Sequence, residues 1–129
     1  MFRNLVEFIE MEQGEAQVAL RLLARHTNSW QVMHGGVTMT LLDVVMSMAG
    51  RSLLPDERSG VTVEMSTRFL QPGGIVGDRI VAKGKVYHRS MTMYSCEGEV
   101  WNDGRLVAKA MGTFKYLKRI DTGTATVDR

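Results

Sequence analysis

Residues whose chemistry could act on a carbonyl group are concentrated in one segment, which reads HTNSWQVMHGGVTMTLLD from His26 to Asp43. Gly35 and Gly36 come directly before an apolar run that predicts a helix. The first N–H groups of a helix have no partner within it and lie at the positive end of its dipole, and glycine lets a ligand approach them closely. Such a terminus can stabilise the oxyanion that forms when a carbonyl is attacked, although a plain loop-to-helix turn would use the same two glycines.

Asp43 is the only acidic residue in this otherwise apolar helix. A buried carboxylate is costly unless it is paired or used, and a general base or a nucleophile is one such use. Thr40 and Ser47 lie on the same helical face as Asp43. The alternative interpretation is therefore a stripe of polar residues in contact with water.

The loop before the helix adds His34, next to the glycines, and Asn28. A histidine here could orient the backbone, and an asparagine could position a water or a carbonyl. From spacing alone, two ordinary hydrogen-bonding loop residues fit equally well.

The spacing between Gly36 and Asp43 has a geometric consequence. Seven residues of helix rise by about 10 Å, which an aspartate side chain cannot span. If both groups act on one carbonyl, they must come from different copies of the chain. A catalytic interpretation therefore requires at least a dimer, with two equivalent sites related by two-fold symmetry.

The elements expected around this segment are one buried helix and five strands. The strands alternate apolar and polar residues, and Asp103-Gly104 is typical of a tight hairpin turn. In the strand from Val61 to Phe69, we expect Thr62 on the opposite face from Val61, Val63, Met65 and Phe69. The expected ranges are a helix from Val37 to about Leu54 and strands over Glu15–Leu23, Val61–Phe69, Ile80–His88, Met91–Trp101 and Leu106–Leu117. This order predicts an α+β fold with an antiparallel sheet.

The bulk properties favour one domain over residues 1–119, followed by a loose tail at 120–129. A net charge of +2 does not call for a nucleic-acid partner. The N-terminal segment lacks the apolar run expected of a signal peptide, and charged residues within Val37–Leu54 argue against a membrane span. The single cysteine, Cys96, excludes an intrachain disulfide, fits a cytoplasmic location and is interpreted as a small packed side chain rather than a catalytic thiol. The three histidines are not spaced as a metal-ligand cluster, so we expect no metal.

Taken together, the His26-Thr27-Asn28, His34-Gly35-Gly36 and Leu42-Asp43 groups resemble the signature of hotdog-fold acyl-coenzyme A thioesterases. The branch they resemble is the phenylacetate-degradation (PaaI-like) branch of the 4-hydroxybenzoyl-coenzyme A thioesterase superfamily. Further similarity lies in Gly60–Met65, Phe69-Leu70-Gln71-Pro72 and Gly77-Asp78, and it extends from about residue 12 to Leu117.

The resemblance implies a long central helix wrapped by an antiparallel sheet, with two such units paired edge to edge as a homodimer and often assembled as dimers of dimers. It implies that Gly35 and Gly36 polarise the thioester carbonyl, with Gly35 the usual donor, and that Asp43 of the partner chain is the base or nucleophile. Asn28 and His34 match loop residues that orient the carbonyl and the attacking water. No cofactor is implied beyond the coenzyme A of the substrate.

Candidate substrate-binding residues are Thr62, Ser47, Arg89 and Ser90. Thr62 stands where related enzymes often carry a serine that helps to hold the water. Arg89 and Ser90 could meet coenzyme A phosphates, but a solvated turn is the simpler interpretation for each. The candidates to line the acyl pocket are Met39, Leu42, Val45, Met46 and Met48, although core packing is the better explanation for most of them.

Two other functions stay open from the sequence. A hotdog-fold dehydratase or hydratase would pair a catalytic histidine with an acid in other motifs, whereas His34 is followed here by two glycines. A non-catalytic acyl-coenzyme A binding or sensing module would have little use for a buried acid such as Asp43.

Overall fold

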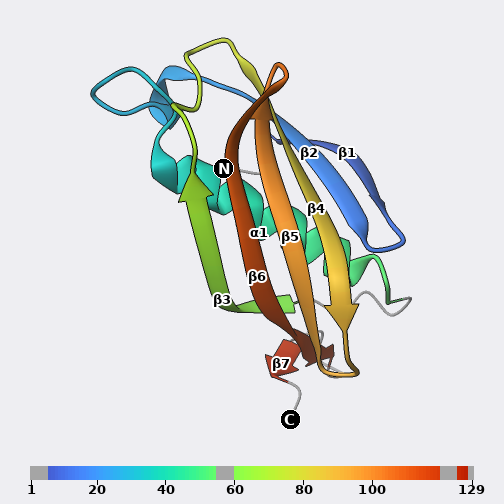
Figure 1. Cartoon of the computed structure of the whole chain (residues 1–129). Coiled ribbons are helices and arrows are strands. Elements are labelled where there is room, and N and C mark those ends of the chain that lie inside the picture. The colour runs from blue at the N-terminus through green and yellow to red at the C-terminus, as the bar shows by residue number, and fades with distance from the viewer. Residues whose placement is uncertain (1–5, 55–59, 120–124, 128–129) are drawn as a thin grey trace.

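The computed structural model describes residues 6–54, 60–119 and 125–127. Its strands form one antiparallel sheet with the order β1-β2-β4-β5-β6-β3, and β7 pairs with β6 (Figure 1). The strands are β1 (Val6–Glu12), β2 (Glu15–Arg21), β3 (Gly60–Phe69), β4 (Arg79–Arg89), β5 (Met93–Asn102), β6 (Arg105–Arg119) and β7 (Ala125–Val127). The two edges of the main sheet are therefore β1 and β3.

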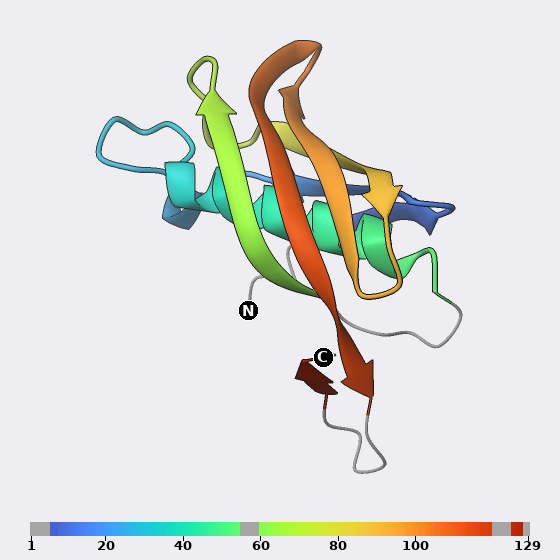
Figure 2. The same cartoon turned by 60° about the horizontal axis from the view of Figure 1, so that its bottom comes forward.

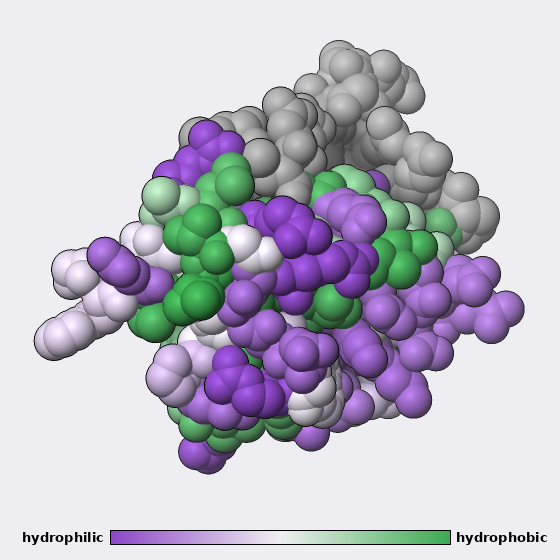
Figure 3. Space-filling model, turned by 90° about the horizontal axis from the view of Figure 1, so that it is seen from above, coloured by the Kyte–Doolittle hydropathy of each residue, from purple (hydrophilic) through white to green (hydrophobic). Residues whose placement is uncertain are grey.

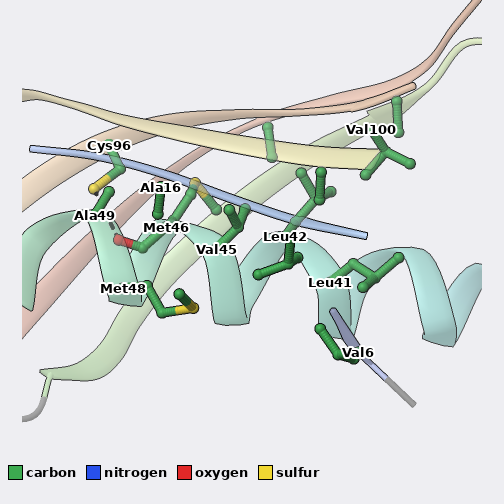
Figure 4. Packing of buried hydrophobic residues seen from close by; sticks show 14 of the residues in the cluster. Val6, Ala16, Leu41, Leu42, Val45, Met46, Met48, Ala49, Cys96 and Val100 are labelled. Atoms are coloured by element: carbon green, nitrogen blue, oxygen red, sulfur yellow. Dashed lines mark hydrogen bonds between the residues drawn. The ribbon is translucent and has the colours of Figure 1, made fainter. Parts of the chain in front are cut away.

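One helix, α1 (Gly35–Arg51), lies against the concave face of the curved sheet, as Figures 1 and 2 show. Its 17 residues span roughly 25 Å, enough to cross most of the strands. Leu41, Leu42, Val45 and Met46 are completely buried between α1 and the sheet (Figure 4). The expected α+β fold, with a central helix wrapped by a sheet, is confirmed.

Glycines in the middle strands let α1 approach the sheet closely. A methyl group on Gly84 would lie 2.6 Å from the carbonyl oxygen of Val45, and one on Gly98 would lie 3.0 Å from the Met46 side chain. Gly84 and Gly98 are paired across β4 and β5, so together they form a shallow seat under the helix. Close packing of this kind leaves no room for a side chain at either position.

Aromatic residues from the sheet hold the C-terminal end of α1. The hydroxyls of Tyr94 and Tyr116 donate hydrogen bonds to the carbonyl oxygens of Ser47, at 3.3 Å, and Gly50, at 3.0 Å. The Gly50 carbonyl lies in the last turn of α1, where carbonyl groups have no partner within the helix. The Tyr94 ring also stacks on Phe114 with their centroids 5.1 Å apart.

The predicted elements agree with the structure except at both ends of the chain. Asp103 and Gly104 have φ values of 47° and 84°, as the predicted hairpin between β5 and β6 requires. Strand β1 was not predicted, because a register shift between Phe8 and Glu10 breaks its alternation. In the expected tail, residues 120–124 and 128–129 lie outside the described residues, while β7 pairs with the end of β6.

A bulge in β3 corrects the predicted faces of this strand. The register against β6 shifts between Thr62 and Glu64, which leaves Val63 as the extra residue. Thr62 pairs with the buried Phe114, and Phe69 pairs with the buried Ala108, so both point to the helix side of the sheet. The expectation that Thr62 and Phe69 face opposite sides is therefore wrong.

Cys96 is buried, and its Sγ lies 3.3 Å from the carbonyl oxygen of Met46 as a hydrogen-bond donor. Burial raises the pKa of this thiol to about 12. The structure thus agrees with a packed, unreactive side chain. Among the described residues, no helix has the length and apolar character to cross a membrane.

Candidate active site

The N-terminus of α1 is arranged so that one of its two glycine amides stays open. His34 is the N-cap: its Nδ1 accepts a hydrogen bond from Gly36 N at 2.8 Å, and its carbonyl oxygen accepts one from Val37 N at 3.0 Å. No described residue accepts a hydrogen bond from Gly35 N, and Gly35 is exposed. Gly35 N–H is therefore the amide available to a ligand, while Gly36 N–H is held by His34.

The tautomer of His34 follows from this contact. Because Nδ1 is an acceptor, the neutral imidazole carries its proton on Nε2, which is a donor. The His34 side chain is exposed, and its Nε2–H group has no acceptor among the described residues. His34 thus combines a capping contact with a free N–H group.

The loop before the helix is fixed by backbone hydrogen bonds. His34 N donates to the carbonyl oxygen of His26 at 2.8 Å, and Met33 N donates to that of Gly74 at 2.7 Å. His26 is only 4% exposed, and its Nδ1 accepts from Leu23 N at 2.8 Å. Burial, helped by the charge of Arg25, lowers the pKa of His26, so the ring is held neutral as a structural acceptor.

Asn28 shapes the same loop with its side-chain oxygen. Asn28 Oδ1 accepts hydrogen bonds from Trp30 N at 2.9 Å and from Val32 N at 3.4 Å. Its Nδ2 group has no acceptor among the described residues. The amide is therefore oriented by the loop and keeps its donors for a ligand.

Asp43 projects from the middle of α1 toward the edge strand β3. Its Oδ1 accepts a short hydrogen bond from Thr62 Oγ1 of β3. Asp43 is half-buried and Thr62 is exposed. The structure thus brings together two of the predicted site residues.

The Gly35 group and the Asp43 group lie at different ends of β3. A methyl group on Gly35 would lie 3.7 Å from the Phe69 ring, at the C-terminal end of the strand. Asp43 contacts Thr62, near its N-terminal end. On α1, the eight residues from Gly35 to Asp43 rise by about 12 Å, which the Asp43 side chain cannot span. The structure therefore does not bring Gly35 and Asp43 together within one chain.

The other predicted substrate-binding residues lie near the Asp43 end. The Ser47 backbone carbonyl accepts from Tyr94, while Ser90 Oγ accepts from Met93 N at 3.1 Å in the β4–β5 turn. Arg89 is exposed beside it. Sheet register places Arg89, Tyr94, Phe114 and Thr62 in one row across four strands. The spacing of strands puts Arg89 about 14 Å from Thr62 along this row.

The candidate acyl-pocket residues are mostly core residues. Leu42, Val45 and Met46 have no exposed surface, and Met48 is 7% exposed. Met39 is half-buried. Core packing thus accounts for most of this set, as the simpler interpretation had it.

The sequence interpretation missed a groove beside Gly35, which Phe69, Leu70 and Val107 help to line. The signal that could have found it is Pro72-Gly73-Gly74, which ends β3 abruptly and turns the chain back over the helix start. In Figure 3, the end of the molecule seen from above carries apolar surface among hydrophilic surface. The described residues contain no group of three His, Cys, Asp or Glu side chains that could hold a metal ion.

A single helix held in the concave face of a curved antiparallel sheet defines the hotdog class of proteins. The model of the Thioesterase superfamily matches residues 31–109, which include the helix start and Asp43. The chain therefore belongs to the thioesterase superfamily and is a thioester hydrolase. The resemblance inferred from its motifs is confirmed.

Individual relatives agree with this membership. Human acyl-coenzyme A thioesterase 13 is 29% identical over 116 residues, which cover 87% of this chain and 79% of the relative. The mouse protein of the same name is 31% identical, and the match covers 76% of this chain and 69% of that protein.

Solved structures agree as well. The PaaI protein of the Escherichia coli phenylacetic acid degradation operon is 27% identical and superposes with a TM-score of 0.81, covering 88% of this chain and 81% of that one. A hypothetical thioesterase protein from Streptococcus pneumoniae with coenzyme A is 28% identical, with a TM-score of 0.79 and 86% and 87% covered.

Proposed function

We propose that this protein hydrolyses acyl-coenzyme A at two equivalent sites of a homodimer, each made by Gly35 of one subunit and Asp43 of the other. The observation that carries the proposal is the separation of the two groups along β3. Gly35 lies beside Phe69, whereas Asp43 is bonded to Thr62. The names of the thioesterase 13 relatives and the coenzyme A in the Streptococcus structure support the substrate class.

The character of the two sheet edges favours β3 as the dimer contact. β1 has seven residues, of which three are glutamates, and a short, charged strand of this kind protects an edge from pairing. β3 has ten residues and exposes Val61, Val63 and Phe69. A long, apolar edge of this kind is a ready partner for another strand.

Antiparallel pairing of β3 with its copy brings the separated groups together. Two-fold symmetry places the Thr62 end of one strand opposite the Phe69 end of the other. Asp43 of the partner subunit then faces Gly35 N–H across the new contact. Because of the bulge at Val63, Thr62 and Phe69 point to the same side of the joined sheet.

The reaction then follows from the groups at this junction. The thioester oxygen accepts a hydrogen bond from Gly35 N–H, and Asp43 of the partner takes a proton from a water that attacks the carbonyl carbon. The resulting oxyanion stays on Gly35 N–H until the C–S bond breaks. The thiolate of coenzyme A leaves with the electron pair and takes up the proton, and the free acid is released. Direct attack by Asp43, through a transient anhydride, would use the same placement.

The surrounding donors suit this role. His34 Nε2–H and the free Nδ2 group of Asn28 lie on the loop beside Gly35, where they can orient the carbonyl or the water. The Thr62 hydroxyl fixes the carboxylate that acts as base. Gly36 acts indirectly in this proposal, since its N–H holds His34 in place.

Coenzyme A is proposed to extend from the junction toward the β4–β5 turn of the subunit that supplies Asp43. Arg89 and Ser90 stand about 14 Å from Thr62, a distance that the pantetheine arm can cover, and Arg89 can pair with phosphate oxygens. Assembly of two dimers into a tetramer, and a cytoplasmic location, complete the proposal; the free Cys96 thiol supports the latter.

The function is tested by replacing the proposed base. Asp43→Asn keeps the shape of the side chain and should lower kcat with several acyl-coenzyme A esters by at least about a hundredfold. Asp103→Asn, at the exposed β5–β6 turn, makes the same change away from the site and should keep wild-type rates. A thiol reagent reads released coenzyme A without interference, because Cys96 is buried. Near-normal hydrolysis by folded Asp43→Asn would refute the assignment.

A further inference from the structure

Two loops meet at the end of the sheet where α1 begins (Figure 1). The first loop, residues 27–34, leads into Gly35, and the second, residues 70–78, joins β3 to β4. A backbone hydrogen bond connects them, because Met33 N donates to the carbonyl oxygen of Gly74 at 2.7 Å. Met33 comes two residues before Gly35, so the second loop supports the segment that presents the open amide.

Asn102 and Asp78 hold the second loop from its other side. Asn102 Nδ2 donates to the carbonyl oxygen of Gly73 and to Asp78 Oδ2, both at 3.0 Å. Asp78 Oδ2 also accepts from Ile75 N at 3.0 Å. The hydrogen bond from Ile75 N, and after it the one from Asn102, lowers the pKa of Asp78, so this carboxylate is ionised at neutral pH. The carbonyl that follows Gly73 along the chain is the one that accepts from Met33 N.

Asn102 is a polar residue in a row of the sheet that is otherwise apolar. Sheet register pairs Ile80 of β4 with Leu20 on one side and with Asn102 of β5 on the other. All three residues are buried, and Asn102 is only 6% exposed. Burial of an amide is costly unless hydrogen bonds replace those to water. The contacts with the second loop supply these hydrogen bonds, and an apolar side chain at this position could not make them.

The Gly73-Gly74 pair lies between Asn102 and the first loop. A methyl group on Gly74 would lie 2.7 Å from Asn102 Nδ2 and 3.0 Å from Asp78 Oδ2. One on Gly73 would lie 2.7 Å from the Met33 side chain. Contacts this short leave no room for a side chain, so the pair transmits the position of Asn102 to Met33 with little freedom.

We propose that Asn102 and Asp78 are positioning residues that fix the direction of the Gly35 N–H group. They act through the Gly73-Gly74 pair and Met33. The inference rests on the proposed function and adds two residues that act at a distance from the substrate. Neither loop forms a helix or a strand, so the direction of the amide depends on contacts of this kind. An oxyanion donor must already point to where charge develops, and a displacement of about 1 Å can cost about a hundredfold in rate.

The first test replaces each partner of the pair. Asn102→Ala removes the donor and should lower kcat of the folded protein by about tenfold or more. KM should stay within about threefold, because the loss falls on the transition state rather than on the bound ester. Asp78→Ala is a second variant with the same expectation, and it decides the question if Asn102→Ala does not fold. Asp78→Asn is the conservative replacement: its Oδ1 can accept from both Ile75 N and Asn102, so kcat should stay within about threefold of wild type.

Ser52→Ala is the matched control for lost stability. Ser52 Oγ accepts from Gly14 N at 2.8 Å and donates to the carbonyl oxygen of Ala49 at 2.6 Å. This substitution therefore also removes two hydrogen bonds of one side chain, but at the other end of α1 from Gly35. Both alanine variants should lower Tm, whereas only Asn102→Ala should lower kcat measured well below Tm.

The path to Gly35 is tested by combining two substitutions. Gly35→Pro removes the N–H group, and proline is well tolerated at the first position of a helix. If Asn102 acts on this group, adding Asn102→Ala to Gly35→Pro should change kcat by no more than about twofold, whereas independent effects would multiply.

The inference would be overturned by a wild-type kcat in folded Asn102→Ala or Asp78→Ala, or by an equal loss of kcat in Ser52→Ala. It would also be overturned if Asn102→Ala lowered kcat by the same factor with and without Gly35→Pro. In each of these cases the wild type would still hydrolyse acyl-coenzyme A esters. If the wild type hydrolyses none of these esters, the proposed function fails, and the inference fails with it.

Discussion

The hydroxyl of Thr62 on the edge strand β3 donates a hydrogen bond to the carboxylate of Asp43 on the central helix. This contact joins the only acid of α1 to the strand that we propose as the dimer edge. It depends on the bulge at Val63, which turns Thr62 toward the helix. A single irregularity in the strand thus orients the proposed base.

Replacing Thr62 should separate the hydroxyl from the methyl group. Thr62→Val keeps the shape but leaves Asp43 without its donor, so kcat should fall about tenfold or more. Thr62→Ser keeps the hydroxyl and should retain most of the activity. Steady-state kinetics on both variants checks this, and equal activity in Thr62→Val and wild type would show that the contact does not matter for the reaction.

The N–H group of Gly35 can be removed by a substitution that should preserve the fold. Proline is favoured at the first position of a helix, and the extended backbone of His34, with φ −63° and ψ 138°, is compatible with a following proline. Gly35→Pro should therefore fold but lose about 10²- to 10³-fold in kcat, the usual effect of losing one oxyanion donor. Gly35→Ala keeps the N–H, makes only an ordinary 3.7 Å contact with Phe69 and is the control, expected within severalfold of wild type. Similar kinetics for the two variants would contradict the role of Gly35.

His26 should make the stability depend on pH. Its pKa is lowered by burial and by Arg25, so protonation favours the unfolded chain. The stability that neutral His26 gives to the fold is fully present above the pKa of His26 in the unfolded chain, about 6.5. This stability is lost as the pH falls from there toward the lower pKa of His26 in the folded chain. His26→Asn keeps an acceptor for Leu23 N but cannot titrate. Denaturant unfolding at pH 7.5 and 5.5 should show a larger loss of stability in wild type than in His26→Asn, and equal losses would refute this.

The close packing of α1 against the sheet can be tested at Gly84. Gly84→Ala puts a methyl group 2.6 Å from the Val45 carbonyl, which is backbone and cannot rotate away. We expect a loss of about 1–3 kcal/mol in the free energy of unfolding, because overpacking forces the helix outward. Chemical denaturation measures this free energy. Gly35→Ala is the control, because a methyl group at Gly35 makes only an ordinary contact. A stability equal to wild type would mean that the helix is not seated this closely.

The main elements of the fold were predictable because their periodicities are regular. The helix and five of the strands appear in the sequence as periodic apolar residues, and the Asp103-Gly104 pair predicts the hairpin turn between β5 and β6. The bulges were not predictable in this way. A single extra residue at Val63 reverses the face of Thr62, and a register shift after Phe8 hides β1, because alternation is the signal that a bulge destroys.

At the candidate active site, the residue types indicated which groups are reactive. They did not indicate which of these groups are already hydrogen-bonded within the chain. Gly35 and Gly36 look equivalent in the sequence, whereas His34 Nδ1 takes the amide of Gly36 and leaves that of Gly35. The groove was also hidden, since Phe69, Met33 and Val107 come from distant segments. The proposal of a second subunit, by contrast, rests on helix rise, which the sequence alone supplies.

Mixing two inactive subunits tests the shared site most directly. Asp43→Asn and Gly35→Pro chains, unfolded and refolded together, should form half mixed dimers, and each mixed dimer carries one intact site. Activity should therefore return to about a quarter of the wild-type value per subunit, while each variant alone stays inactive. A mixture no more active than its two parents, although mixed dimers are shown to form, would contradict the account.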